Sequence, residues 1–434
     1  MPSSIAEESR TRAESVRLVA LASFIGTTIE WYDFFLYGTA AALVFNRLFF
    51  PEYEPLTGTL LAFTTYAIGF VARPLGGIVL GHFGDRIGRK SMLVLTLVIM
   101  GVATFLIGLV PTHDQIGPWA PLLLVALRFA QGFGVGGEWG GAVLMAVEHA
   151  PAGKRGFYGS WPQIGVPAGL VLSTAVFALF RRMPDDQFLA WGWRVPFLLS
   201  IVLVLVGLLI RMRILETPAF ARVKEAGHEV RLPVVEVLRK YPKEVLLAGG
   251  ARFAENGGFY FYSAFTLVYA RHIGLSDQIV LNGIVIASLL ELGAIPFFGA
   301  LSDRLGRRPV YLFGAVTTAV FAYPLFWFID TQSTALVWLA LIAVFVFSHA
   351  AMYAPQAAFL SELFGTRVRY SGASLGAQLS SVFAGAMAPF IGTAILSKGY
   401  GRGMLALYLV AMAMITIVSV WMASETAHHD VERL

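Results

Sequence analysis

Long apolar runs recur along the 434-residue chain, and turn residues or charges separate each run from the next. A helix that crosses a bilayer needs roughly 20 mostly apolar residues. Twelve runs meet this requirement, and the longest polar stretch lies between the sixth and the seventh. The predicted spans are 18–45, 57–80, 91–110, 119–147, 157–180, 194–211, 245–270, 278–300, 310–329, 335–358, 371–396 and 403–423.

The pattern therefore predicts an all-α membrane protein with two six-helix halves, 18–211 and 245–423. A polar loop, 212–244, joins the halves, and the tails 1–17 and 424–434 flank them. The tail 1–17 is polar and lacks the short apolar stretch and cleavage site of a signal peptide, so the first span is expected to remain in the membrane.

The composition supports a membrane protein over a soluble one. Hydrophobic residues make up 57% of the chain and charged residues 14%, whereas an ordinary soluble domain is about 25% charged. The sequence has no Cys, which excludes a disulfide scaffold, thiolate catalysis and Cys-ligated metals.

The basic residues predict the orientation. If the N-terminus is cytoplasmic, 22 Lys and Arg lie on the cytoplasmic side and 7 on the other side, with 3 inside spans. This excess follows the positive-inside rule, so both termini are expected in the cytoplasm and the protein in the inner or plasma membrane. The net charge of +5 thus reflects topology. The lipid bilayer is an expected partner and nucleic acid is not.

Two loops of the chain share a motif. Gly81, Asp85, Arg86, Gly88 and Arg89 recur 218 residues later as Gly299, Asp303, Arg304, Gly306 and Arg307. A second repeat has the same seven-residue spacing in both copies, Glu148 with Arg155 and Glu362 with Arg369. The repeats predict two halves in the same orientation, related by a pseudo-twofold axis.

The loop motif G-x-x-x-D-R-x-G-R-K/R resembles that of the major facilitator superfamily, and the likeness covers the whole chain. Other segments resemble the metabolite:proton symporter family within it, whose permeases carry shikimate, α-ketoglutarate, citrate, and proline or betaine. These segments are Glu30–Gly38, Arg73–Gly77, Arg128–Gly132, Gly136–Glu138 and Glu216–Phe220. The resemblance implies transport by alternating access, with spans 1, 4, 7 and 10 lining the cavity.

The repeated loops are predicted to form a gate at the cytoplasmic ends of the helices. A carboxylate such as Asp85 can pair with an Arg of its own loop or lie at a neighbouring helix N-terminus. Such contacts would close the outward-open state and break in the inward-open state. The alternative is that these charges only anchor helices and fix topology. The predicted gate comprises Asp85, Arg86, Arg89, Glu148, Arg155, Asp303, Arg304, Arg307, Glu362 and Arg369.

Charges inside the membrane are the second candidate site. A charge at mid-bilayer costs at least about 2.5–3.5 kcal/mol, so such residues must face each other or a watery cavity. From depth along the helices, we expect Asp33 or Glu30 opposite Arg128, and Arg73 opposite Glu138. The alternative for each pair is a static buried ion pair. The charged residues well inside the spans are Glu30, Asp33, Arg73, Arg128, Glu138, Arg252, Glu255 and Glu291.

Proton coupling needs a carboxyl group that exchanges an Arg neighbour for water, because this exchange changes its proton affinity. Asp33 is the predicted proton carrier, Glu30 its rival and His349 a further candidate, although a lone His is more often a packing residue. Arg128 would bind a substrate carboxylate or the vacated acid. The predicted substrate-binding residues are Arg128, Tyr32, Tyr37, Gln163, Glu255, Asn256, Tyr260 and Gln378. Arg252 could instead extend to the membrane surface, and Glu291 could serve the same site or pack.

The sequence thus predicts a monomeric proton symporter that imports a small polar metabolite bearing a carboxylate. The coupling ion is the proton, and no cofactor or metal is expected. A zwitterionic osmolyte such as betaine or proline is the alternative substrate, with drug/proton antiport a more distant one. An enzyme is disfavoured, since no H-E-x-x-H motif or nucleotide-binding loop is present. A channel is disfavoured by the two-half repeat.

Overall fold

The computed structural model describes residues 2–212, 217 and 233–427, and within these ranges the chain is helical without strands. The first six predicted spans correspond to the elements of the N half. They are α1 (Pro2–Ala40), η1 (Ala41–Phe45), α2 (Asn46–Phe49), α3 (Pro55–Ile87), α4 (Arg89–Leu109), α5 (His113–Ile116), α6 (Trp119–His149), α7 (Arg155–Arg181), α8 (Asp185–Ala190), η2 (Gly192–Arg194) and α9 (Val195–Met212).

The last six predicted spans correspond to the elements of the C half, and a short helix, α11 (Pro233–Lys240), precedes them. The C half comprises α12 (Pro242–Tyr260), η3 (Phe261–Phe265), α13 (Thr266–His272), α14 (Asp277–Leu305), α15 (Arg307–Asp330), α16 (Thr334–Ala343), η4 (Val344–His349), α17 (Ala350–Glu362), α18 (Arg369–Ser380), η5 (Ser381–Ala386), α19 (Met387–Ser397) and α20 (Arg402–Met422). The predicted fold class is confirmed. Parts of the loop 212–244 and of the tail 424–434 lie outside the described residues.

Ten of these helical segments are long and apolar enough to cross a membrane, counted over the described residues. The other two predicted spans, 18–45 and 245–270, are also helical. Their midpoints carry Glu30 with Asp33, and Arg252 with Glu255. These ionisable residues lower the hydropathy of the two helices. Buried charges also lie in spans that are apolar enough by this measure, such as Arg73 in α3 and Arg128 in α6.

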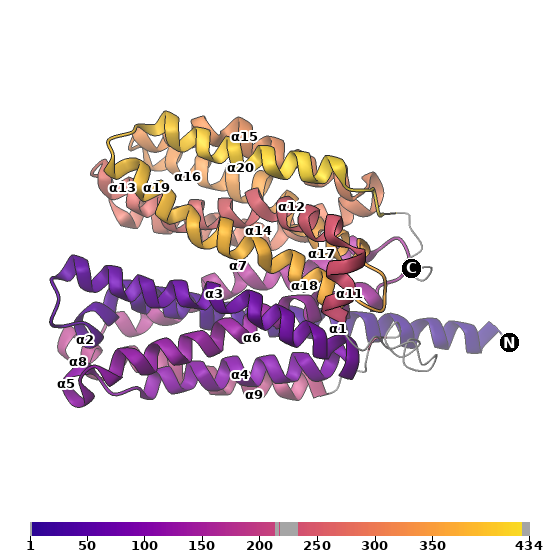
Figure 1. Ribbon diagram of the computed structural model, residues 1–434, viewed down its shortest axis with the longest axis horizontal. Helices are drawn as coiled ribbons and strands as arrows, with labels where there is room; N and C mark the ends of the chain where they lie inside the picture. Colours follow the sequence, from indigo (N-terminus) through magenta and orange to yellow (C-terminus); the bar gives the residue numbers. More distant parts are fainter. Residues whose placement is uncertain (1, 213–216, 218–232, 428–434) are drawn as a thin grey trace.

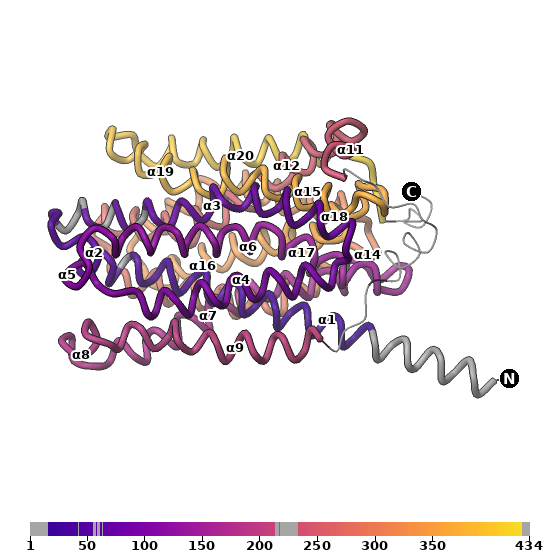
Figure 2. The backbone as a smooth tube through the Cα atoms, turned by 60° about the horizontal axis from the view of Figure 1, so that its bottom comes forward, coloured from indigo at the N-terminus to yellow at the C-terminus, as the bar shows by residue number. Residues whose placement is uncertain are grey.

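The two halves lie side by side with their long helices nearly parallel (Figures 1 and 2). In the N half α1 packs on α7, and α3 on α6. In the C half α12 and α15 both pack on α20. The halves meet where α7 packs on α14 and α17, and where α3 packs on α18. Helix α1 begins and α20 ends at one end of the bundle (Figure 1), here called the gate end; the opposite end is the far end.

Glycines bring α3 and α6 into close contact beside the charged residues. A Cβ atom at Gly132 would overlap the carbonyl of Gly69, and one at Gly136 would overlap the carbonyl of Arg73. Small residues allow helix backbones in a membrane to approach this closely. The close approach holds Arg73 on α3 next to the helix that carries Arg128.

Four of the spans contain a π-helical segment, namely η1, η3, η4 and η5. Single-turn π segments inside α-helices are often found at functional sites. Segment η3 directly follows Tyr260, and η4 ends at His349. Two residues predicted for substrate and proton binding therefore lie at places where the regular helix is interrupted.

Candidate substrate and proton site with its gate

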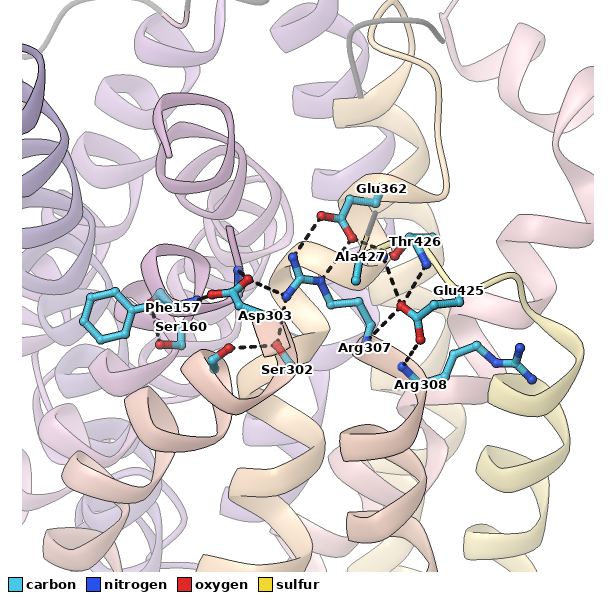
Figure 3. Close-up of polar contacts among 12 residues, drawn as sticks. Phe157, Ser160, Ser302, Asp303, Arg307, Arg308, Glu362, Glu425, Thr426 and Ala427 are labelled. Atoms are coloured by element: carbon cyan, nitrogen blue, oxygen red, sulfur yellow. Dashed lines mark hydrogen bonds and ion pairs between the residues drawn. The ribbon is translucent and has the colours of Figure 1, made fainter. Parts of the chain in front are cut away.

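The gate end is closed by two carboxylates that each reach into the opposite half. Asp85, at the end of α3, accepts hydrogen bonds from the backbone N–H groups of Tyr370 (3.2 Å) and Ser371 (2.8 Å), in the first turn of α18. Asp303, at the end of α14, accepts two bonds of 2.8 Å from the first turn of α7, as Figure 3 shows. A helix N-terminus stabilises an anion through its unpaired N–H groups and its dipole. The structure thus has the helix-terminus contact that was predicted for Asp85.

Arginines extend each carboxylate contact into a network. Arg89 lies 3.8 Å from Asp85 and 3.4 Å from Glu148, and Arg369 of the C half lies 3.1 Å from Glu148. In the second copy Arg307 lies 2.7 Å from Asp303 and 3.2 Å from Glu362.

Glu148, Glu362 and Arg369 of the second repeat thus belong to the network, but neither Glu pairs with the Arg seven residues after it: Glu148 pairs with Arg369, and Glu362 pairs with Arg307. The chain folds so that Arg369 crosses to the N half. Arg155 is instead the first residue of α7, whose first-turn N–H groups bind Asp303.

Two predicted gate residues lie outside this network. Arg86 and Arg304 are exposed, and neither forms an ion pair among the described residues. Each directly follows its Asp along a helix, and neighbouring helical residues point about 100° apart. The repeated Arg of the D-R pair thus faces away from the contact that the Asp makes.

The segment after α20 adds a contact that the sequence analysis missed. Glu425 accepts hydrogen bonds from the backbone N–H groups of Arg307 (2.9 Å) and Arg308 (3.0 Å), at the start of α15. Thr426 donates its hydroxyl proton to Glu362 at 2.6 Å (Figure 3). Partial burial opposes ionisation of Glu425, but the backbone N–H donors outweigh it and hold the pKa of Glu425 below its usual value.

A repeated dipeptide was the available signal for this contact. Glu-Thr occurs at 216–217 after the sixth span and at 425–426 after the twelfth. Thr217 is buried and hydrogen-bonds Glu148, as Thr426 does Glu362. The gate, from here on, means Asp85, Arg89, Glu148, Asp303, Arg307, Glu362, Arg369, Glu425 and Thr426.

Two guanidinium groups lie buried near the interface between the halves. Arg73 and Arg128 are 2% and 0% exposed, and neither forms an ion pair with any described acidic residue. The Arg73 guanidinium carbon lies 4.4 Å from the ring centre of Phe34, and that of Arg128 lies 4.4 Å from the same ring. Arg73 also contacts Trp31 and Phe70, and Arg128 contacts Tyr37 and Tyr66. Aromatic faces attract a cation, but they do not supply the carboxylate that both positive charges lack at ion-pair distance among the described residues.

The two acids of α1 are buried nearby without forming the predicted pair. Glu30 and Asp33 are 2% and 1% exposed, and neither lies within ion-pair distance of Arg128. Gln131 intervenes: it accepts from Arg128 at 3.1 Å and donates to the Thr104 hydroxyl at 2.6 Å. Thr104 lies beside Asp33 but donates its proton to the carbonyl of Met100. By donor–acceptor geometry, neither carboxyl oxygen of Asp33 has a hydrogen-bond partner among the described residues.

The second predicted pair, Arg73 with Glu138, is wrong. Glu138 forms an ion pair with Arg211 of α9, which also donates to the carbonyl of Leu93, and Glu138 accepts from Thr96 at 3.1 Å. Depth along the helices suggested Arg73, but the rotation of α6 points Glu138 toward α4 and α9.

Several predicted substrate contacts are already hydrogen-bonded in this conformation. The hydroxyl of Tyr32 donates to Pro196 within the N half, and that of Tyr37 pairs with Thr65 at 2.6 Å. Gln163 donates to the carbonyl of Tyr353 at 2.9 Å, and Gln378 donates to that of Gly136 at 3.2 Å. The two Gln residues thus hold the halves together here.

The C half contributes its own polar residues at the interface. Glu255, Asn256 and Tyr260 of α12 are all buried, and Tyr260 lies beside the Arg73 guanidinium. The ring of Tyr260 packs edge-on against Phe70 of the N half, with ring centres 5.1 Å apart. The residues brought together from both halves, here called the central site, are Glu30, Asp33, Arg73, Arg128 and Tyr260. The side chain of Asn256 instead lies against Gly385 of the C half.

Comparison with known proteins agrees with this architecture. The sequence model of the Major Facilitator Superfamily matches residues 23–389. The chain is 44% identical to the shikimate transporter of Escherichia coli (strain K12) over 421 residues, which is 95% of each chain.

The chain belongs to the major facilitator superfamily. It is also 40% identical to the inner membrane metabolite transport protein YhjE of the same strain, over 98% of both chains. It is 33% identical to the proline/betaine transporter of that strain, over 96% of this chain and 85% of the relative.

Solved structures share the fold at low sequence identity. The proton:xylose symporter XylE bound to 6-bromo-6-deoxy-D-glucose gives a TM-score of 0.77 at 17% identity, over 96% of this chain and 97% of that one. The protein is therefore a multi-pass membrane transporter with twelve helices in two halves, and not an enzyme.

Proposed function

We propose that this transporter is a proton symporter that imports a small polar metabolite bearing a carboxylate, by alternating access. The observation that carries the proposal is the pair of buried guanidiniums, Arg73 and Arg128, which lack an acidic partner among the described residues. The excess of 22 over 7 basic residues supports a cytoplasmic gate end.

A buried cation needs a counter-ion, because an unpaired charge away from water is costly. A substrate carboxylate that enters between the halves would supply this charge. An Arg side chain presents a fork of N–H donors that matches a carboxylate in a bidentate manner. Arg128 is the proposed main contact, with Arg73 and Tyr260 on the opposite side of the substrate.

Asp33 is the proposed proton carrier. An ionised carboxylate without any hydrogen-bond partner in a buried position is unfavourable, so the closed conformation suits the neutral acid. Once water reaches Asp33, the ionised form is attracted to the guanidinium that the departing substrate leaves. Substrate release and proton release are thereby linked through Arg128, with Gln131 and Thr104 between the two groups.

The aromatic residues favour an anionic substrate over a zwitterionic osmolyte. A quaternary ammonium group is usually bound over aromatic faces. Here Trp31, Phe34 and Phe70 already stack on Arg73. Since a guanidinium fills this position, the rings are not free to enclose a second cation. Shikimate transport by a 44% identical relative agrees with the anionic choice.

A binding panel followed by transport assays tests the proposal. We expect purified protein to be thermally stabilised by shikimate or a dicarboxylate, but not by betaine, and proteoliposomes to accumulate the same compound when the outside is acidic. Asp33→Asn should lose the part of uphill uptake that the proton on Asp33 drives, and should retain counterflow exchange. The exposed control Asp185→Asn should keep both. Stabilisation by betaine alone would contradict an anionic substrate, and full pH-driven accumulation by Asp33→Asn would contradict the role of Asp33.

A further inference from the structure

A second group of ionisable side chains lies inside the C half, apart from Asp33 and the two guanidiniums. The imidazole of His349 lies between two carboxylates. Its Nδ1 is 2.7 Å from Glu291 Oε1, and its Nε2 is 3.5 Å from Glu255 Oε1. The side chains of His349, Glu291 and Glu255 are 2%, 0% and 3% exposed. These three residues are called the C-half trio.

The positions of the two ring nitrogens of His349 determine how many protons the trio binds. A neutral imidazole has one N–H donor and one bare nitrogen. If His349 were neutral between two carboxylates, the bare nitrogen would face a carboxylate oxygen. An imidazolium that donates to both Glu255 and Glu291 removes this repulsion. The geometry of the trio therefore favours an imidazolium between two ionised acids, which holds one proton more than a neutral His349 between the same acids.

Neighbouring groups stabilise the negative charge of Glu255, whereas the negative charge of Glu291 depends on the proton of His349 for its balance. Arg252 lies 3.1 Å from Glu255, and the amide of Gln356, assigned with its nitrogen toward Glu255, donates to it at 2.8 Å. Glu291 Oε2 is buried without a hydrogen-bond partner. Among the described residues, His349 is therefore the group whose proton balances the charge of Glu291.

Within the part of the chain that the structure describes, no cation from outside the trio other than Arg252 forms an ion pair with the acids of the trio. The remaining titratable groups around it are the phenols of Tyr260 on α12, Tyr311 on α15 and Tyr353 on α17. Glu30 of α1 acts on Tyr353 from the N half. Among the described residues no cluster has the arrangement of a metal site. The ion that this geometry suits is therefore the proton.

The trio is covered by side chains that the opposite half holds in place. The ring centres of Phe259 and Tyr353 each lie 4.9 Å from that of His349. Phe259 packs against Phe35 of the N half, with ring centres 6.1 Å apart, and the carbonyl of Tyr353 accepts the bond from Gln163. Separation of the halves breaks both contacts and gives water access to His349.

The repeat assigns opposite charges to the two halves at this depth. Glu291 follows Arg73 by 218 residues, the same separation as the two copies of the loop motif. The two side chains therefore occupy corresponding positions on corresponding helices. The N half carries a cation there, which suits an anionic substrate, whereas the C half carries an acid.

We propose that Glu291 and His349, oriented by Glu255, form a second proton-binding site, which holds a proton while the halves are closed and releases it when they separate. Each cycle then moves two protons, one on Asp33 and one on the C-half trio. The stoichiometry rests on the proposed function, whereas the protonation of His349 does not.

Nitrogen NMR of protein labelled with ¹⁵N-histidine tests the protonation without a substrate, since His349→Gln identifies the signal. We expect both ring nitrogens of His349 to carry protons from pH 6 to 8, and Glu291→Gln to yield a neutral ring in this range. Ser288→Ala, a buried change one turn away on α14, should leave the signal unchanged. A neutral His349 in the unmodified protein overturns the proposal.

Accumulation of labelled shikimate in proteoliposomes, with the membrane potential held at zero, tests the stoichiometry. Each coupled proton multiplies the accumulation ratio by about ten per pH unit of gradient, because one unit is 1.36 kcal/mol. We expect about 100-fold per unit for the unmodified protein and for Ser288→Ala, and about tenfold for Glu291→Gln. A tenfold ratio for the unmodified protein, or an unchanged ratio in Glu291→Gln, overturns the second site. If the unmodified protein does not accumulate shikimate, the proposed substrate class fails, and the NMR result alone decides on the trio.

Discussion

Asp85 and Asp303 make the same contact in opposite directions: each carboxylate lies at the N-terminus of a helix in the other half. Asp85 of the N half binds the start of α18, and Asp303 of the C half binds the start of α7. Both contacts exist only while the helix ends of the two halves are close. The charge-assisted bonds therefore contribute to the closed gate and to no conformation in which the gate is open.

Replacement of either Asp should open the gate end. Asp85→Asn turns an amide N–H₂ toward backbone donors, and each lost charge-assisted bond costs about 1.5–3 kcal/mol. We expect the ratio of open to closed gate to rise at least about tenfold, since 1.4 kcal/mol corresponds to a factor of ten.

Spin labels can measure this change, because the chain has no native Cys. Ile87 and Leu305 are 56% and 60% exposed at the ends of α3 and α14, so labels at Ile87→Cys and Leu305→Cys report the distance between the halves. Asp185→Asn at the far end serves as the control. An unchanged distance distribution in Asp85→Asn would show that the contact does not hold the gate.

Glu138 and Arg211 should depend on one another for stability. Removal of one member of a buried ion pair costs about 3–5 kcal/mol, because the other charge remains buried and unpaired. We expect Glu138→Gln and Arg211→Met each to lower the melting temperature clearly, and the double variant to recover part of the loss. A double-mutant cycle with Arg73→Met in place of Arg211→Met should give little coupling. Equal coupling in both cycles would support the Arg73–Glu138 pair that was predicted from depth along the helices.

Arg128 should determine affinity for the carboxylate. We expect Arg128→Gln to weaken binding of the transported anion by about 1.5–3 kcal/mol, the range for a hydrogen bond to a charged group. Arg128→Lys should recover only part of this, since an ammonium keeps the charge but not the planar fork. Isothermal titration measures both, with exposed Arg47→Gln as control. Full affinity in Arg128→Gln would remove this residue from the substrate site.

Glu425 should link the gate to pH. Its pKa is lowered in the folded protein, so its contribution to stability is complete above the unfolded value of about 4.3 and is lost as the pH falls through the lower folded value. We expect Glu425→Gln to increase hydrogen exchange at the first amides of α15 at pH 7. The difference from the unmodified protein should shrink when both are compared under acidic conditions. Exposed Glu54→Gln should exchange like the unmodified protein at either pH; a pH-independent difference would assign the effect to packing.

The fold and the location of the gate were accessible from the sequence for a physical reason. Backbone groups in a bilayer must be satisfied within each helix, so length and apolarity alone define the spans. The duplicated loop motif identified Asp85 and Asp303 because both copies need the same carboxylate at the same helix end. The partners were not accessible: Arg369 pairs with Glu148 across the halves, and Glu425 reaches α15 from beyond the last span.

The sequence by itself determined the twelve spans, the division into halves and the burial of Asp33, Arg73 and Arg128, since the bilayer excludes unpaired charge from its lipid face. Only the tertiary structure decided which charges meet. Depth along a helix fixes the height of a side chain, whereas helix rotation and the packing of neighbouring helices fix its direction. For this reason Glu138 pairs with Arg211, and His349 lies between two carboxylates. Arg73 and Arg128, in turn, have no acidic partner at ion-pair distance within the described ranges.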